Sequence, residues 1–392
     1  MQPNMPLSDL LEAVRKNAAL PEDQSEATPP QVYTSQEFLE LERTRIFNHE
    51  WICVGRSDEF QNPGDYRVTT ISSDDVVVLR DHDGELRAMS NICRHRMMSL
   101  LEGEGTLRGK ITCPYHAWTY NLDGQLIGAV HMRDNFDKST CRLPQFAVEE
   151  WLGWVYVNLD PDAEPLAPRL APLAKLLANY NVASYRTLFR VDEVWDTNWK
   201  ILFQNFMEPY HLFAVHKDTV EKVLPTQHAH VITGGPGYCL YTQGRNPGVA
   251  FEYSEAMSNP NPDLSEDEVN CVPLFGAFPA QMASVSAERT FWMSLMPIET
   301  NKVRVFWGVD VHPDAMPDGS EFDARVAELK ASFHAINGED KPVTAAIARN
   351  AAALSAQPGR LSPKEQTIWE FQRYLARLLT TGSEAKTFVR KV

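Results

Sequence analysis

The chain lacks any apolar run long enough to cross a membrane, and it has no excess of basic residues. Its 52 acidic residues outnumber its 37 lysines and arginines, which gives a formal net charge of −15. Proteins that bind nucleic acid carry a basic surface, and anionic membranes attract basic segments. We therefore expect neither nucleic acid nor a membrane as a partner.

Cysteine is also scarce, with six residues in 392, which excludes a disulfide-stabilised scaffold. The first residues lack the basic and then apolar layout of a secretory signal, so we expect a cytoplasmic protein with reduced thiols. Reduced cysteines close to histidines indicate a metal site. No Gly-x-Gly-x-x-Gly follows a strand-like segment, so the chain shows no sign of its own dinucleotide site.

The length favours more than one domain, and the patterns predict an α+β protein in three parts. Residues 1–44 read as an arm and a helix that pack on the last domain. Residues 45–160 contain short apolar runs separated by turns, which predict a small all-β domain. Residues 161–392 mix helical and strand-like segments, and predict a larger domain with a curved antiparallel sheet flanked by helices.

Four metal-ligand residues stand out in the predicted β domain. Cys93 and His95 are separated by one residue, and Cys113 and His116 by two. Thiolate with imidazole suits zinc or iron, but zinc fingers group cysteine with cysteine and histidine with histidine. One Cys and one His in each loop instead suits a [2Fe–2S] cluster with two Cys on one iron and two His on the other. A structural zinc site is the alternative.

The pattern C-x-H-x₁₇-C-x₂-H, with NICRHR before it and CPYHAWTYNLDG after it, resembles the Rieske signature. The resemblance implies a Rieske [2Fe–2S] cluster held by Cys93, His95, Cys113 and His116. Met97 occupies a position where that family commonly has glycine, and this could alter the loop without touching the ligands.

A second constellation lies at Glu208, His211 and His216, in the pattern E-x-x-H-x₄-H. On a regular helix the two histidines would point about 140° apart, so they can share a metal only if the helix ends or distorts between them. Two His and one carboxylate form the facial triad of non-haem Fe(II) oxygenases. Two packed histidines on an apolar helix are the alternative.

With both patterns in one chain, the sequence resembles the oxygenase (α) component of Rieske non-haem iron oxygenases over nearly its full length. The resemblance implies a mononuclear Fe(II), O₂ as co-substrate, and a flavin and iron–sulfur reductase, with or without a ferredoxin, fed by NAD(P)H. It also implies a head-to-tail homotrimer. There Glu208 would link His116 on the cluster side to His211 on the iron side of a neighbouring subunit.

The third iron ligand must be a carboxylate, and two candidates compete. Glu365 sits in SPKEQ, where a capping box with Ser362 already explains it. Asp340 follows Glu339, and the family has a Glu–Asp pair that opens a helix and supplies the ligand. We choose Asp340, with an acid at the start of a solvated helix as the alternative.

The substrate is less well defined by the sequence. Glu at 208 and the tail GRLSPKEQTIWEFQRYLA resemble the branch that acts on quaternary ammonium compounds such as choline, carnitine and glycine betaine. Aromatic walls would bind such a cation, and the candidates are Phe206, Tyr210, Tyr238, Tyr241, Phe291, Trp292, Phe306 and Trp307.

The expected function is mono-oxygenation of a small molecule, with N-demethylation or hydroxylation of a methylated amine as the leading reading. Hydroxylation or O-demethylation of an aromatic compound is the alternative, and an aromatic acid would use Arg245, Arg289 or Arg304 for its carboxylate. A protein that only carries electrons is the third hypothesis, and it would need no second iron site.

Overall fold

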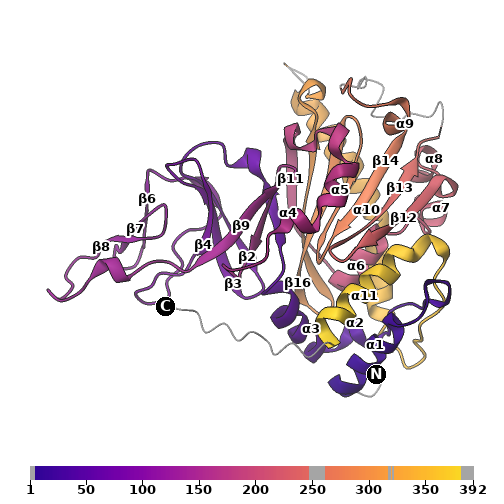
Figure 1. The fold of residues 1–392 in the computed structure, drawn as a ribbon, viewed down its shortest axis with the longest axis horizontal. Helices are drawn as coiled ribbons and strands as arrows, with labels where there is room; N and C mark the ends of the chain where they lie inside the picture. Colours follow the sequence, from indigo (N-terminus) through magenta and orange to yellow (C-terminus); the bar gives the residue numbers. More distant parts are fainter. Residues whose placement is uncertain (1–4, 247–260, 317–318, 320–321, 381–392) are drawn as a thin grey trace. The chain divides into compact units, whose positions relative to one another are not determined.

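The computed structural model describes residues 5–246, 261–316, 319 and 322–380, which fold into two compact units (Figure 1). Phe47–Leu166 form one unit, and the residues up to Ile46 join those from Ala167 onward in the other. The predicted α+β class is confirmed, with an all-β unit and a larger unit built on an antiparallel sheet. The domain boundaries that we expect at 44 and 160 stay a prediction.

The smaller unit contains a seven-stranded sheet in the order β1-β10-β9-β4-β3-β2-β5 and a three-stranded sheet β6-β7-β8, all antiparallel. Its elements are β1 (Ile52–Arg56), η3 (Ser57–Glu59), β2 (Asp65–Ile71), β3 (Asp74–Arg80), β4 (Leu86–Ser90), β5 (Glu104–Thr106), β6 (Lys110–Thr112), β7 (Thr119–Asn121), β8 (Leu126–Gly128), η4 (Lys138–Thr140), β9 (Gln145–Trp151) and β10 (Trp154–Asn158). A core that includes Val77, Ile111 and Tyr120 lies beneath the two cysteine loops.

The larger unit is built on a second seven-stranded antiparallel sheet, in the order β11-β17-β16-β15-β14-β13-β12. Its strands are β11 (Arg186–Trp195), β12 (Ala229–Gly235), β13 (Tyr238–Gly244), β14 (Cys271–Ala277), β15 (Gln281–Val285), β16 (Arg289–Glu299) and β17 (Lys302–Val311). Residues 289–311 form the hairpin expected from their alternating pattern, with Glu299 opposite Lys302 at the turn.

The remaining elements of the larger unit are helices, and several of them pack on this sheet. They are α1 (Leu7–Ala18), η1 (Glu22–Gln24), α2 (Gln31–Thr34), α3 (Gln36–Glu42), η2 (Arg43–Phe47), α4 (Leu166–Arg169), α5 (Ala171–Leu176), η5 (Ala178–Tyr180), η6 (Val182–Ser184), α6 (Trp199–Phe206), α7 (Leu212–Val215), α8 (Val220–Val223), η7 (Thr226–His228), α9 (Glu266–Val269), η8 (Pro313–Ala315), α10 (Phe322–Asn350), η10 (Pro363–Glu365) and α11 (Gln366–Thr380). No described helix is both long and apolar enough to span a membrane.

The core of the larger unit joins α6 and α11 to the sheet. The rings of Phe203 and Phe371 stack with centroids 4.2 Å apart, and Phe278 lies 5.8 Å from Phe203. The amphipathic α1 buries Leu10 and Val14 and packs on α11. This packing fixes α6, which leads directly into the motif that contains Glu208.

Of the two helix starts predicted near the C-terminus, the structure confirms the one at Ser362 and contradicts the one at Glu339. Ser362 caps η10 and α11 with Glu365 in a capping box, as the sequence predicts. The expectation that Glu339 and Asp340 open a helix is wrong, because they lie well inside the 29-residue α10. The helix continues through Pro342, since packing on α6 and β11 outweighs the loss of one backbone hydrogen bond.

Candidate functional site

The two cysteine loops of the smaller unit have the same backbone geometry. The Cys93 N–H donates to the Met98 carbonyl at 2.8 Å, and the Cys113 N–H donates to the Trp118 carbonyl at 2.8 Å. Each loop also closes a turn in which the residue four positions after the cysteine donates back to that cysteine's carbonyl. The sequence spacing of the two motifs therefore produces two matching ligand loops.

The fourth residue after each cysteine adopts a left-handed conformation. These residues are Met97, at φ 58°, and Ala117, at φ 55°. Glycine takes up this conformation without steric cost, whereas other residues are strained there. This explains why glycine suits position 97. Met97 is 82% exposed, so its side chain meets no steric conflict and the left-handed conformation costs only backbone strain.

The four residues fit a cluster that has different ligands on its two irons. Cys93 and Cys113 are buried, at 1% and 3% exposure. Burial is the main cause that raises the pKa of the Cys93 thiol, and the nearby Cys113 raises it further. A bound cation would hold such thiols as thiolates. The His95 and His116 rings lie outside them with centroids 4.6 Å apart, and His95 stacks on Trp118. This is the arrangement that a Rieske cluster requires.

The helix that contains the start of the second motif ends before the two histidines, so they do not lie on one regular helix. α6 ends at Phe206, because Pro209 cannot continue the helix and disfavours helical geometry at Glu208 before it. A short helix, α7, follows, with His211 at its N-terminal end and His216 at its C-terminal end. The two imidazole centroids are therefore 5.2 Å apart rather than on opposite sides of one helix.

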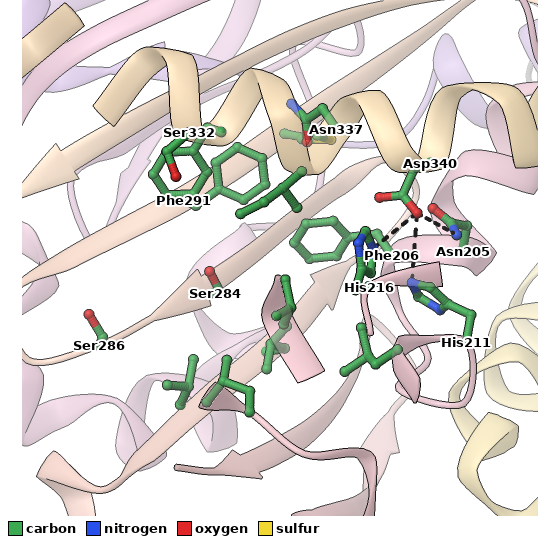
Figure 2. A pocket seen from close by; sticks show the side chains of 18 of the residues that line it. Asn205, Phe206, His211, His216, Ser284, Ser286, Phe291, Ser332, Asn337 and Asp340 are labelled. Atoms are coloured by element: carbon green, nitrogen blue, oxygen red, sulfur yellow. Dashed lines mark hydrogen bonds and ion pairs between the residues drawn. The ribbon is translucent and has the colours of Figure 1, made fainter. Parts of the chain in front are cut away.

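The structure brings His211 and His216 together with Asp340 of α10, and the ligand atoms of all three lie within 4.8 Å of one another (Figure 2). The Asp340 Oδ1 atom is 3.8 Å from His211 Nε2 and 3.2 Å from His216 Nε2. Two imidazoles and one carboxylate that face one point match the facial triad of non-haem iron sites. The donor set therefore fits a mononuclear Fe(II).

A carboxylate on the other ring nitrogen orients each histidine. The Nδ1 atom of His211 lies 2.6 Å from Glu208 Oε1, and the Nδ1 atom of His216 lies 2.6 Å from Glu339 Oε2. Each Nδ1–H donates to its carboxylate, so each Nε2 lone pair points toward Asp340. Burial lowers the pKa of His216, but Asp340 and Glu339 raise it by more, so the net pKa lies above its ordinary value.

Glu365, the alternative third ligand, does not join this group. Its carboxylate accepts the Ser362 N–H at 2.6 Å in the capping box. Burial raises the pKa of Glu365, and the nearby Glu208 raises it further. Asp340 instead receives a hydrogen bond from the Asn205 side chain at 3.3 Å. The sequence reading missed the Asn205 contact and the Glu339 contact with His216, because only the fold brings their helices together.

A cavity of about 160 Å³ opens from the three candidate ligands and runs between α10 and the sheet (Figure 2). Phe206, Tyr241 and Phe291 line it, as predicted for three of the eight aromatic candidates. Phe291 stacks on Phe333 with centroids 4.7 Å apart, so the wall continues on α10. The described lining also contains Trp195, and the sequence reading named neither Trp195 nor Phe333.

The other five aromatic candidates do not belong to the described lining of this cavity. Trp292 and Trp307 are buried in the core, where their indole N–H groups donate to Asp310 and Glu193. Alternation along a buried strand does not distinguish a core aromatic from a pocket aromatic. Tyr210, Tyr238 and Phe306 complete the five.

Of the three candidate arginines, two line the cavity and one does not. Arg245 and Arg289 line the cavity, whereas Arg304 pairs with Asp192 across β17 and β11 at an exposed position. Glu208 is 7% exposed and lines a second cavity, together with His211 and Glu365. His211 therefore lines both cavities, the one that contains the candidate metal ligands and the one that contains Glu208.

The two units thus define a protein with a [2Fe–2S] domain and a mononuclear iron domain. Comparison with known proteins agrees: residues 50–147 match the Rieske [2Fe-2S] domain, and residues 178–381 match the catalytic domain of the ring hydroxylating alpha subunit. The chain belongs to the Rieske non-haem iron oxygenases, whose cofactors are these two iron centres.

Two relatives are named as oxygenase subunits of monooxygenases, one for carnitine and one for glycine betaine. The carnitine monooxygenase oxygenase subunit of Escherichia coli (strain K12) is 36% identical over 210 residues, and the match covers 53% of this chain and 56% of that protein. The chain therefore spans just over half the length of this relative. The glycine betaine monooxygenase oxygenase subunit of Pseudomonas aeruginosa (strain UCBPP-PA14) is 30% identical over 98% of this chain and 97% of its own length.

The fold is also that of a solved structure. A quaternary ammonium Rieske monooxygenase superposes with a TM-score of 0.81 at 23% identity, covering 96% of this chain and 100% of that one. At this identity the likeness establishes the fold alone.

Proposed function

We propose that the chain is the terminal oxygenase of a multicomponent Rieske system that oxidises an N-methyl group of a methylated or quaternary amine. One oxygen atom of O₂ enters a methyl C–H bond, and the other leaves as water with two electrons and two protons supplied through a reductase. The hydroxymethyl product then releases formaldehyde. The observation that carries this proposal is the convergence of His211, His216 and Asp340 at one end of an aromatic cavity.

Iron held by these three residues would supply the site at which O₂ is activated. The residues around it position the substrate and limit water. Phe206 and Phe291 lie with ring centroids 5.9 Å apart along the cavity wall, and Trp195 and Tyr241 add two buried rings. Aromatic faces attract an ammonium cation that has lost its water, which suits a methylated amine.

The organisation of the holoenzyme belongs to the same proposal. We propose a cytoplasmic homotrimer, with an NAD(P)H-dependent flavin and iron–sulfur reductase as partner. Glu208 supports the head-to-tail arrangement, because its carboxylate accepts the His211 N–H at 3.1 Å and faces the second cavity. His116 of a neighbouring subunit would contact Glu208 from that cavity. We also propose that residues 1–44 are an arm and helix, residues 45–160 the [2Fe–2S] domain and residues 161–392 the mononuclear iron domain.

Hydroxylation or O-demethylation of an aromatic compound is the second candidate. The stacked pair of Phe291 and Phe333, with planes 16° apart, would also hold a planar ring. A pure electron carrier is disfavoured, because such a protein needs no cavity beside a second group of metal ligands.

The experiment supplies purified, iron-loaded protein with a compatible reductase and NADH, and offers methylated amines and aromatic compounds in parallel. Formaldehyde together with demethylated amine is the expected result. A hydroxylated ring without formaldehyde, or a phenol formed together with formaldehyde from a methoxyarene, would favour the second candidate. His211→Ala serves as the control that lacks the metal site, and it should give no product from any substrate.

A further inference from the structure

The end of the cavity remote from the metal ligands is polar, unlike its aromatic middle. In Figure 2 Ser284, on β15, and Ser286, in the turn after it, lie at the opposite end from His211 and Asp340. Ser286 is tied to the neighbouring chain: its hydroxyl donates to Glu288 Oε2 at 3.0 Å and accepts the Arg289 N–H at 3.3 Å. The far end is therefore an ordered polar cluster.

Two arginines belong to this cluster. Arg245 follows β13, and its Nη2 lies 3.2 Å from the same Glu288 Oε2 that accepts from Ser286. Arg289 begins β16 beside Ser286, and both guanidinium side chains belong to the cavity lining. Among the described lining residues, the charged side chains outside the metal group are these two arginines. Arg245 follows β13 and Arg289 begins β16, so the two residues reach the cavity from different parts of the sheet and one ligand group can contact both.

The cavity also offers buried donors for which the described residues provide no acceptor. These atoms are Nε of Arg245 and Nδ2 of Asn337, a residue on α10 that is 2% exposed. A buried donor without a partner carries a free-energy penalty that a ligand acceptor would remove. Both atoms are donors, but only Arg245 belongs to the polar cluster at the far end, because Asn337 lies one turn before Asp340 on α10. A ligand group that completes the far end therefore has acceptor oxygens.

The two ends of the cavity differ in formal charge once Fe(II) and Glu288 are counted: three carboxylates exceed the two charges of Fe(II) at the metal end, and two arginines exceed the single carboxylate of Glu288 at the far end. Asp340 lies at the metal end, with Glu339 and Glu208 behind the two histidines, whereas arginine lies at the far end. An elongated ligand with a cation at one end and an anion at the other matches this polarity. A guanidinium binds a carboxylate with two parallel hydrogen bonds, which fixes orientation as well as affinity.

We propose that Arg245 and Arg289 form a carboxylate-binding subsite, and that the substrate is a methylated ammonium carboxylate. Its carboxylate would lie between the two guanidinium groups, and its methylammonium group would lie among the aromatic rings near the metal ligands. This inference rests on the proposed function for the methylammonium end. The carboxylate end rests on the arginine cluster alone.

The test is a binding measurement that requires no turnover. Isothermal titration is carried out anaerobically, without reductase, on the iron-loaded protein. The probes are trimethylammonium carboxylates with one to four carbons between the two charged groups, each paired with its neutral carboxamide. Wild-type protein is compared with Arg289→Gln, with Arg245→Lys, which keeps a cation against Glu288, and with Arg304→Gln as the control arginine outside the cavity.

We expect wild-type protein to bind at least one carboxylate more tightly than its carboxamide, by about tenfold or more. Arg289→Gln should reduce that preference to about twofold or less while carboxamide binding stays unchanged, and Arg245→Lys should reduce it in part. Arg304→Gln should keep the full preference. Equal binding of carboxylate and carboxamide at every spacer length, or a preference that both cavity variants retain, would overturn the subsite.

Failure of the subsite and failure of the proposed function give different results. An arginine-dependent carboxylate preference without formaldehyde in the turnover assay would keep the subsite and reject N-demethylation. Formaldehyde from an amine that lacks a carboxylate, at a rate that Arg289→Gln leaves unchanged, would keep N-demethylation and reject the subsite.

Discussion

At the scale of single residues, each candidate ligand is positioned by a second side chain. His211 and His216 turn their Nε2 atoms to Asp340 because carboxylates accept from both Nδ1–H groups, and Asp340 in turn accepts from Asn205. Thr219 donates to the same Glu339 oxygen that accepts from His216, at 2.7 Å. The site is therefore oriented before a metal binds, which lowers the cost of binding it.

The contact between Glu339 and His216 gives a prediction for metal affinity. Glu339→Gln keeps the shape but removes the negative charge that makes His216 more basic, so the affinity for Fe(II) should fall by about tenfold or more. Competition with a chromophoric chelator measures it. Glu328→Gln, at an exposed position on the same helix, is the matched control. Equal affinities in the two variants would show that Glu339 does not position the ligand.

Met97 gives a prediction for stability. Its left-handed backbone costs about 1 kcal/mol for a side chain other than glycine, so Met97→Gly should stabilise the smaller unit by roughly 0.5–1 kcal/mol. Met98→Gly, one residue on and without a positive φ, should instead destabilise it by a similar amount. Denaturant titration followed by the visible absorbance of the cluster measures both. A loss of stability in the Met97 variant would contradict this account of the loop.

At the scale of elements, the sequence predicted what depends on local chemistry. The hairpin 289–311, the Ser362 capping box and the paired cysteine loops depend on alternation, on a cap and on spacing, and the structure shows all three. The break after Phe206 could be read from Pro209. The start of α10 could not, because its continuation through Pro342 depends on packing against distant elements. The same limit applies to Trp195 and Phe333, which only the fold assigns to the cavity.

A buried ion pair joins the N-terminal segment to the helix before the metal site. Lys200 Nζ of α6 lies 2.8 Å from Glu42 Oε1 of α3, and both side chains are 0% exposed. Burial raises the pKa of Glu42 and lowers that of Lys200, while each partner opposes the shift of the other. Removing either member would therefore leave the other buried without its counter-charge.

Removing one member should be more harmful than removing both. Lys200→Met alone leaves Glu42 uncompensated and should destabilise the larger unit by about 3–5 kcal/mol, whereas adding Glu42→Leu should recover most of that loss. Urea titrations of the two single variants and the double variant form the cycle. Additive losses would mean that the two charges do not depend on each other.

At the scale of the whole molecule, the proposed head-to-tail trimer requires each iron domain to use a neighbour's cluster. A Cys113→Ser chain would lack the cluster, and a His211→Ala chain would lack the mononuclear iron, so neither should turn over alone. Co-expressed at equal levels, they should recover about a quarter of the wild-type activity per chain, because random mixing places both intact centres together at that frequency. Mixed assemblies without activity, or a monomeric protein, would contradict the arrangement.

The central claim of the account is that His211, His216 and Asp340 hold a mononuclear iron in addition to the cluster. The most direct measurement is iron content with the visible spectrum, for wild-type protein, Asp340→Ala and Glu365→Gln. The account predicts about three irons per chain in wild type and Glu365→Gln, and about two in Asp340→Ala with the cluster spectrum unchanged. About three irons in Asp340→Ala together with a loss in Glu365→Gln would contradict it, and would assign the third ligand to Glu365.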